Sequence, residues 1–176
     1  SLRDEILAPT KLPMAIDFLR GEIIHKGKMG EGMAHLTHYF RPFQAFVMES
    51  AEVEKSRFDQ KTALLILERE AEYLSCSPTR QGLFIYQFEC MARNRLGYDR
   101  GMKAIAEDPV YDEAWKDWIY KIRLRLGATD FADLIYYRSD LYVEDRRRRG
   151  QAGYEPSFTL FFGNQEGRIA RANRGK

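Results

Sequence analysis

The side chains best suited to metal chemistry lie close together in the first quarter of the chain. The only histidines are His25, His35 and His38, and Glu22 precedes His25 by three positions. Glu-x-x-His is half of the carboxylate-bridged di-iron motif of helical bundles, and two histidines three positions apart can share one metal ion from one helix face. A metal ion held by Glu22, His25, His35 and His38 is therefore one alternative for this chain.

Two features of the sequence argue against that metal site. A di-iron bundle needs two copies of Glu-x-x-His, and this sequence has one. At ~100° per residue along a helix, the histidines also lie opposite the apolar stripes of their own segments. We therefore expect surface histidines beside a flexible glycine-rich loop at residues 27–32, and we predict no cofactor.

A run of four consecutive arginines near the C-terminus is the second candidate site, formed by Arg146, Arg147, Arg148 and Arg149. Such a cluster can neutralise nucleic-acid phosphates, and tyrosines nearby could stack on bases. Acidic residues are interleaved with the arginines and would repel phosphate: Asp140, Glu144, Asp145 and Glu155. A charged loop or a protein-binding surface is therefore the expectation for this run, and nucleic-acid binding is the alternative.

A third candidate lies in the segment from Ser77 to Leu96, which we predict to be a helix at the centre of the core. Ser-Pro is a helix start and Gly97 a helix stop, and apolar residues cover most of the circumference. Glu89 falls on the apolar side, with Arg93 one turn later. We expect a buried ion pair between Glu89 and Arg93; the alternative is a carboxylate in a dry pocket, with a shifted pKa.

The same segment carries a narrow polar stripe. Its members recur every seven residues, at Arg80, Gln87 and Asn94. A seven-residue repeat returns to the same side of a helix after two turns. Glu89 lies nearly opposite Gln87, on the apolar side of the helix.

Nucleophilic catalysis has no support in the sequence. It contains no Gly-x-Ser-x-Gly elbow, and neither Cys76 nor Cys90 has a histidine close to it in the sequence. On one helix the two cysteines would be ~20 Å apart, too far for a disulfide, so we expect reduced thiols and a cytoplasmic location. We predict no catalytic residue, no membrane span and no signal peptide, and we lean away from an enzyme.

Composition is that of a globular protein with one core. Of the 176 residues, 44% are apolar and 13% aromatic, so some of the aromatic rings are expected at a partner surface. The net charge is only +2, but from Arg138 onward nine Lys and Arg stand against five Asp and Glu, an excess of +4. The basic excess therefore lies in the C-terminal quarter of the chain.

The order of segments predicts a mainly α protein, a single-domain bundle of about six helices over residues 1–176. The body is residues 10–127, with a break at Arg41-Pro42 and a strongly amphipathic helix carrying Trp115 and Trp118. Residues 128–176 are predicted to form a basic, aromatic-rich appendage with a small β-hairpin or three-stranded meander. Its strands would be 157–162 and 168–170, with a turn at 163–167. Residues 131–143 could be strand or helix, and we favour a strand.

These observations favour a non-catalytic protein-interaction module as the function. Its contact surface would be the aromatic and arginine-rich C-terminal part, used with a protein partner or in self-association. A small helical metalloprotein or enzyme is the first alternative, and nucleic-acid binding through the arginine cluster is the second.

Overall fold

The computed structural model describes residues 11–54 and 57–175 of the chain. These residues form ten α-helices and no strand, and the pairing between extended segments is limited to isolated bridges. Within these ranges no helix has the length and apolar character needed to cross a membrane. The predicted mainly α class is confirmed, whereas the predicted β appendage and the count of about six helices are wrong for the described residues.

Contacts divide the chain into two compact units, Ser1–Val110 and Tyr111–Lys176. The predicted border between body and appendage, at residues 127 and 128, therefore lies inside the second unit. That the whole chain forms one domain stays a prediction.

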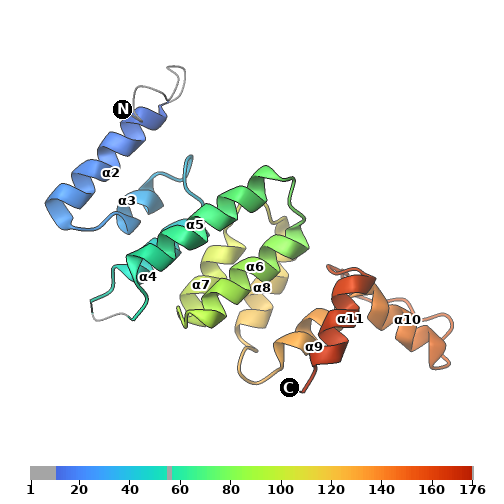
Figure 1. Cartoon of the computed structure of the whole chain (residues 1–176). Coiled ribbons are helices and arrows are strands. Elements are labelled where there is room, and N and C mark those ends of the chain that lie inside the picture. The colour runs from blue at the N-terminus through green and yellow to red at the C-terminus, as the bar shows by residue number, and fades with distance from the viewer. Residues whose placement is uncertain (1–10, 55–56, 176) are drawn as a thin grey trace. The chain divides into compact units, whose positions relative to one another are not determined.

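The first unit is built from six described helices, α2 to α7. Helix α4 packs against α3, α5 and α7, and α6 packs against α5 and α7 (Figure 1). The helix bounds are α2 Leu12–Lys26, α3 Gly30–His35, α4 Pro42–Ala51, α5 Gln60–Ser75, α6 Arg80–Arg93 and α7 Tyr98–Ala106.

Proline and glycine set two boundaries in this unit where the sequence predicts them. Helix α4 begins at Pro42, and Arg41 before it is extended, with φ −76° and ψ 154°. A proline at the first helical position loses no hydrogen bond, and it disfavours helix for the residue before it. Helix α2 ends at Gly27, whose φ of 68° is the left-handed conformation that glycine tolerates.

The glycine-rich stretch at residues 27–32 is not the flexible loop that we predicted. Its second half forms the start of α3, where Gly30 and Gly32 are buried. A Cβ on Gly30 would lie 2.7 Å from the backbone nitrogen of Glu49 in α4. These glycines thus let α3 approach its neighbours closely, and packing outweighs their poor helix propensity.

The central helix α6 is shorter than the predicted segment Ser77–Leu96. The Thr79 side chain, and not that of Ser77, caps it by accepting the N–H of Gly82, and Asn94 is its C-cap. Gly97, with φ 87°, precedes α7. The buried side chains of α6 include Leu83, Phe84, Phe88, Cys90 and Met91, so the predicted place of α6 in the core is confirmed.

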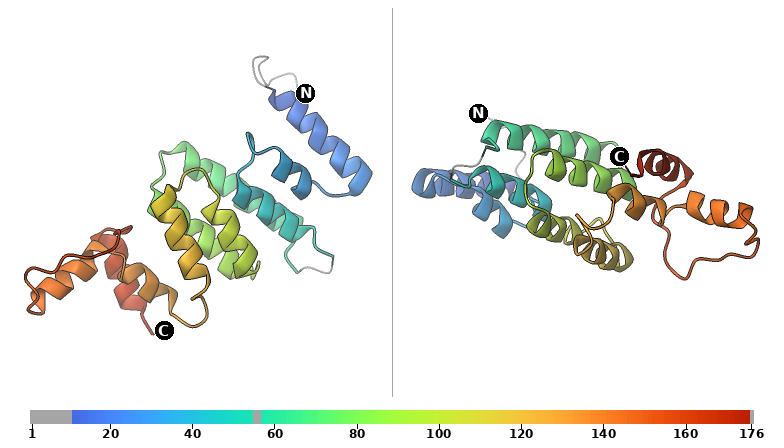
Figure 2. Two further views of the ribbon diagram at one scale, coloured as in Figure 1. Left: turned by 180° about the vertical axis from the view of Figure 1, so that it is seen from behind. Right: turned by 90° about the horizontal axis from the view of Figure 1, so that it is seen from below.

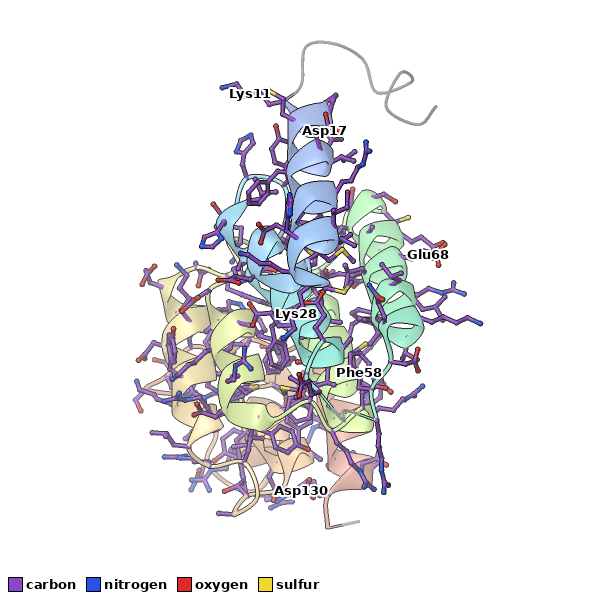
Figure 3. All side chains as sticks on the ribbon, turned by 90° about the vertical axis from the view of Figure 1, so that its left-hand side faces the viewer. Lys11, Asp17, Lys28, Phe58, Glu68 and Asp130 are labelled. Atoms are coloured by element: carbon purple, nitrogen blue, oxygen red, sulfur yellow. The ribbon has the colours of Figure 1, made fainter. Side chains whose placement is uncertain are left out.

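Helix α5 runs beside α6 and starts at a side-chain cap, since Asp59 accepts the N–H of Thr62 at 2.9 Å. Its buried residues are Ala63, Ile66 and, unexpectedly, Glu70. Glu68, on another side of the helix, points away from the ribbon into solvent (Figure 3).

The second unit contains four helices, α8 Glu113–Arg123, α9 Phe131–Tyr136, α10 Asp140–Arg148 and α11 Asn164–Asn173. Helix α11 packs against α9 and α10 (Figure 2). Trp115 and Trp118 of α8 are buried, as predicted, and their rings contact those of Phe161 and Phe162 at centroid distances from 4.6 to 5.6 Å.

Local capping explains why the predicted strands of the second unit are helices or coil. Within residues 131–143, predicted as a strand, Asp130 caps α9 and Ser139 caps α10. Phe161 and Phe162 are adjacent and both face the tryptophans, whereas neighbouring residues of a strand point to opposite faces. Residues 164–173 form α11 where a turn and a return strand were expected.

Candidate functional site

The residues of the predicted metal site do not converge. His25, His35 and His38 are all exposed, and Glu22 forms an ion pair with Lys26 at 2.8 Å. Among the described residues there is no group of three potential His, Cys, Asp or Glu ligands. The histidines lie on α2, on α3 and in the turn that follows α3, where they face outward as helical geometry predicts.

Glu89 and Arg93 form the predicted ion pair, but it is not buried. The exposed fraction is 44% for the Glu89 side chain and 76% for that of Arg93. The prediction of a buried pair is therefore wrong, because α5 and α7 cover the opposite side of α6. Pairs of this kind between exposed side chains contribute little stability.

The buried polar residue of α6 is Gln87, a member of the polar stripe of this helix. It is 0% exposed, and its side-chain nitrogen donates to Glu70 Oε1 at 2.8 Å and to Asp108 Oδ2 at 3.4 Å. Asp108 Oδ1 also accepts Arg41 Nη1 at 2.8 Å and the Val110 backbone N–H at 3.0 Å. This network connects four segments of the first unit: the N-cap of α4 at Arg41, Glu70 in α5, Gln87 in α6, and Asp108 just after α7.

Glu70 is the chemically unusual member of this network. It is 1% exposed, and burial raises its pKa above the ordinary value, against the lowering effect of hydrogen bonds from Gln87 and Gln44. The nearby Asp108 raises that pKa further, while Arg41 lowers it. The Glu70 carboxyl group is thus almost wholly buried and hydrogen-bonded to another residue of the first unit.

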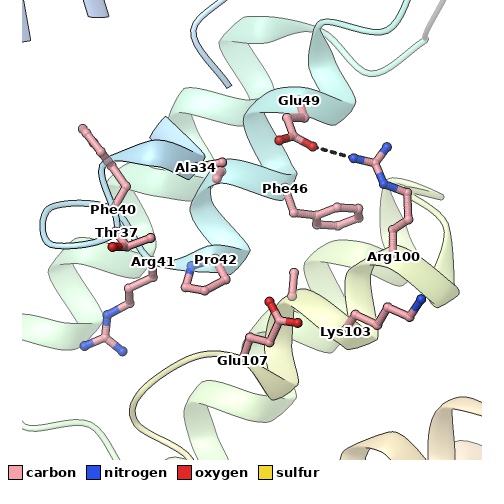
Figure 4. A pocket seen from close by; sticks show the side chains of 12 residues that line it. Ala34, Thr37, Phe40, Arg41, Pro42, Phe46, Glu49, Arg100, Lys103 and Glu107 are labelled. Atoms are coloured by element: carbon pink, nitrogen blue, oxygen red, sulfur yellow. Dashed lines mark hydrogen bonds and ion pairs between the residues drawn. The ribbon is translucent and has the colours of Figure 1, made fainter. Parts of the chain in front are cut away.

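A shallow pocket of about 360 Å³ lies between α4 and α7 (Figure 4). Phe46 forms part of its wall, and the Arg100 guanidinium bonds Glu49 at 2.5 Å across one side. Glu107 and Lys103 of α7 line the other side. Charges of both signs alternate around this pocket, so it favours neither an anionic nor a cationic ligand.

The second unit carries a continuous surface of tyrosine rings and guanidinium groups, here called the Tyr–Arg surface. Its members are Tyr137, Tyr142, Arg146, Tyr154 and Arg174. The Arg146 guanidinium lies 5.9 Å from the centre of the Tyr142 ring and 5.1 Å from that of Tyr154. The Arg174 guanidinium lies 5.4 Å from the Tyr137 ring and donates to the Tyr137 hydroxyl at 3.1 Å.

The three tyrosine rings of this surface also contact one another edge to face. Tyr137 and Tyr142 have centroids 5.3 Å apart at 85°, and Tyr142 and Tyr154 have centroids 6.1 Å apart at 88°. Tyr137 and Arg174 are the C-caps of α9 and α11, and the other members lie in α10 and in the segment after it. The contact between Arg174 and Tyr137 depends on the packing of α11 against α9.

The first three members of the arginine run have different environments. Arg146 stacks on tyrosines, Arg147 Nε donates to the Tyr154 carbonyl at 3.0 Å, and Arg148 pairs with Glu144 at 3.2 Å. The first three belong to the last turn of α10 and not to a loop, a position in which cations complement the helix dipole. The run is therefore largely engaged within its own unit.

Asp145 is a buried residue of α10, close to the Tyr–Arg surface. It accepts Tyr136 Oη at 2.9 Å and Arg171 Nη1 at 2.9 Å. Burial opposes its ionisation, but the hydrogen bonds from Tyr136 and Arg171 and the charges of Arg171 and Arg149 prevail and lower its pKa. Two of the acidic residues that we expected to repel phosphate, Glu144 and Asp145, therefore pair with Arg148 and Arg171.

Comparison with known proteins identifies no relative. Neither a protein family, nor a curated protein, nor a solved structure matches this chain.

Proposed function

We propose that this chain is a non-catalytic interaction module whose Tyr–Arg surface binds a protein partner. The observation that supports this function is the stacking of Arg146 on Tyr142 and Tyr154, next to Arg174 on Tyr137. Tyrosine and arginine are enriched among the residues that contribute most to binding at protein interfaces.

The side chains of the Tyr–Arg surface are already held in place in the free protein, which supports a role in binding. The guanidinium groups are already held against rings and carboxylates, so little side-chain freedom remains to be lost on binding. Tyr137 is 42% exposed, the Arg174 side chain beside it is 35% exposed, and Arg146 is half-buried. A partner could therefore bury rings and guanidinium groups in one step.

Charge favours an acidic partner. The excess of +4 from Arg138 to the C-terminus includes Arg147, Arg148 and Arg149, all exposed at the end of α10. Complementary charge accelerates encounter and selects among partners more than it raises affinity. An acidic peptide or protein surface is the partner that fits this part of the chain.

The test is quantitative affinity capture from the source cells, followed by direct binding of each recovered protein to the purified chain. The double variant Tyr137→Ala, Arg174→Gln should lose the partner. The matched control is Tyr120→Ala, Arg123→Gln, which removes another arginine–tyrosine pair of the same unit, with 5.9 Å between guanidinium and ring. If every recovered protein binds the first double variant as tightly as the original chain, the proposed function is wrong.

Nucleic-acid binding is the second candidate, because rings beside guanidinium groups are also how single strands are bound. The ion pairs of Arg148 with Glu144 and of Arg171 with Asp145 disfavour it, since phosphates would have to compete with carboxylates. Titration with a labelled single strand at ~50 mM salt would decide, because binding to phosphates is strongest at low salt. Binding there that falls steeply with salt and is lost on changing Arg146–Arg149 to Gln would favour this candidate.

A further inference from the structure

A small pocket of the second unit gathers three cationic side chains around an apolar floor. It measures about 100 Å³ and is lined by Lys121, Arg125 and Arg138 together with Trp118, Leu134 and Tyr137. No acidic residue lines it. In this it differs from the pocket of the first unit, where Glu49 and Glu107 accompany the basic residues.

The three cations of this pocket are only partly neutralised. Lys121 pairs with Asp117 at 2.5 Å, and Arg138 Nη1 donates to the Thr159 carbonyl at 3.1 Å while its guanidinium stacks on Phe158 at 4.6 Å. Within the described ranges, Arg125 forms no ion pair. Two guanidinium groups thus line one small pocket, and the Asp117 carboxylate that pairs with Lys121 is not part of that lining.

Arg125 and Arg138 repel each other across this pocket. Burial lowers the pKa of Arg138, and the charge of Arg125 lowers it further, while Asp117 acts in the opposite direction. Helices α8 and α9 both end beside the pocket, at Leu124 and Tyr137. The negative end of a helix carries about half a charge, so two such ends offset about one of the three positive charges.

We propose that this pocket binds a phosphate group, as inorganic phosphate or as a phosphate monoester. With Lys121 paired to Asp117 and the helix ends counted, about one positive charge is left over for an anion to neutralise, and arginine presents paired N–H donors that match phosphate oxygens. The space suits one phosphate group and not a nucleotide, and the apolar floor of Trp118 and Leu134 would favour a monoester with an aromatic or aliphatic substituent. The pocket shares Tyr137 with the Tyr–Arg surface, but a small ion alone is enough to test it, without the protein partner.

Trp118 makes the binding measurable, since the chain has only two tryptophans. Tryptophan fluorescence of the full chain would be followed while inorganic phosphate or phenyl phosphate is added at constant ionic strength, with chloride as the balancing ion. Saturable change with both probes is expected. Arg125→Gln should weaken binding about tenfold, the loss of one charge-assisted hydrogen bond.

The matched control is Arg168→Gln, which removes the same charge from an exposed position outside the pocket. It should bind both probes as the original chain does. Equal weakening by Arg168→Gln and Arg125→Gln would show diffuse attraction and overturn the proposal, as would the absence of saturation. Equal affinity for phenylacetate and phenyl phosphate would overturn the phosphate assignment. Neither result bears on partner capture through the Tyr–Arg surface.

Discussion

Gln87 donates a hydrogen bond to Glu70 over 2.8 Å, between two side chains that are each at most 1% exposed. The same amide nitrogen reaches Asp108, so one neutral side chain stands between two buried carboxyl groups. Only Asp108 has a strong cationic partner, Arg41 at 2.8 Å. Glu70 is therefore the group whose charge the fold accommodates least.

Replacing Glu70 with Gln should stabilise the first unit at alkaline pH. Burial raises the pKa of Glu70 above 4.5, the value expected for the unfolded chain, so its stabilising contribution is fully present below that value and is lost as pH rises through the folded-state pKa. The Gln variant has no ionisable group at this position, so it does not lose stability in this way as the pH rises. Urea unfolding of both proteins at a series of pH values measures the difference, which should be smallest near pH 4.5 and grow with pH. A difference that is constant across the series would contradict this prediction.

Gln87→Leu should destabilise the protein, although leucine is apolar and the site is buried. The substitution removes the donor shared by Glu70 and Asp108 and leaves a buried carboxyl group short of a partner, at a cost of about 1–3 kcal/mol. Gln60→Leu, at an exposed position of α5, is the control and should change stability by less than about 0.5 kcal/mol. Equal effects of the two substitutions on the free energy of unfolding would show that the network contributes nothing.

Replacing glycine with alanine should have opposite effects on stability at two positions, Gly30 and Gly21. Gly30→Ala would place a methyl group 2.7 Å from the Glu49 nitrogen and should cost about 1–3 kcal/mol, because the atoms it meets are backbone. Gly21 lies inside α2 with open space around it, so Gly21→Ala should stabilise by about 0.5–1 kcal/mol. Thermal unfolding of both variants tests this, and a tolerated Gly30→Ala would show that α3 does not pack closely on α4.

Trp115→Ala should be the most damaging of these changes, at about 3–5 kcal/mol, because the ring contacts Trp118, Phe161 and Phe162. Leu124→Ala is the control in the same unit, since Leu124 is 77% exposed. Near-ultraviolet circular dichroism would follow the loss of aromatic packing directly. A Trp115→Ala variant with unchanged aromatic signals and stability would contradict the core described for the second unit.

Helix boundaries governed by neighbouring residues could be predicted from the sequence. The start of α4 at Pro42 and the end of α2 at Gly27 depend on φ preferences that each residue carries with it. The burial of Trp115 and Trp118 followed from the spacing of apolar residues along one helix. The exposure of the histidines followed from the same geometry.

Properties that depend on distant segments could not be predicted in this way. Gln87 resembled a surface residue because its spacing matched Arg80 and Asn94, and only the approach of Glu70 and Asp108 makes its burial favourable. The C-terminal segments resembled strands because aromatic and β-branched residues suit sheets, but no neighbouring strand exists in the described chain to pair with them, and side-chain caps favour helices instead. The sequence alone determined where this chain turns and which helices have an apolar side. The tertiary structure decided which polar groups meet, because a hydrogen bond or an arginine–tyrosine contact needs two side chains a few ångströms apart, whatever their separation along the chain.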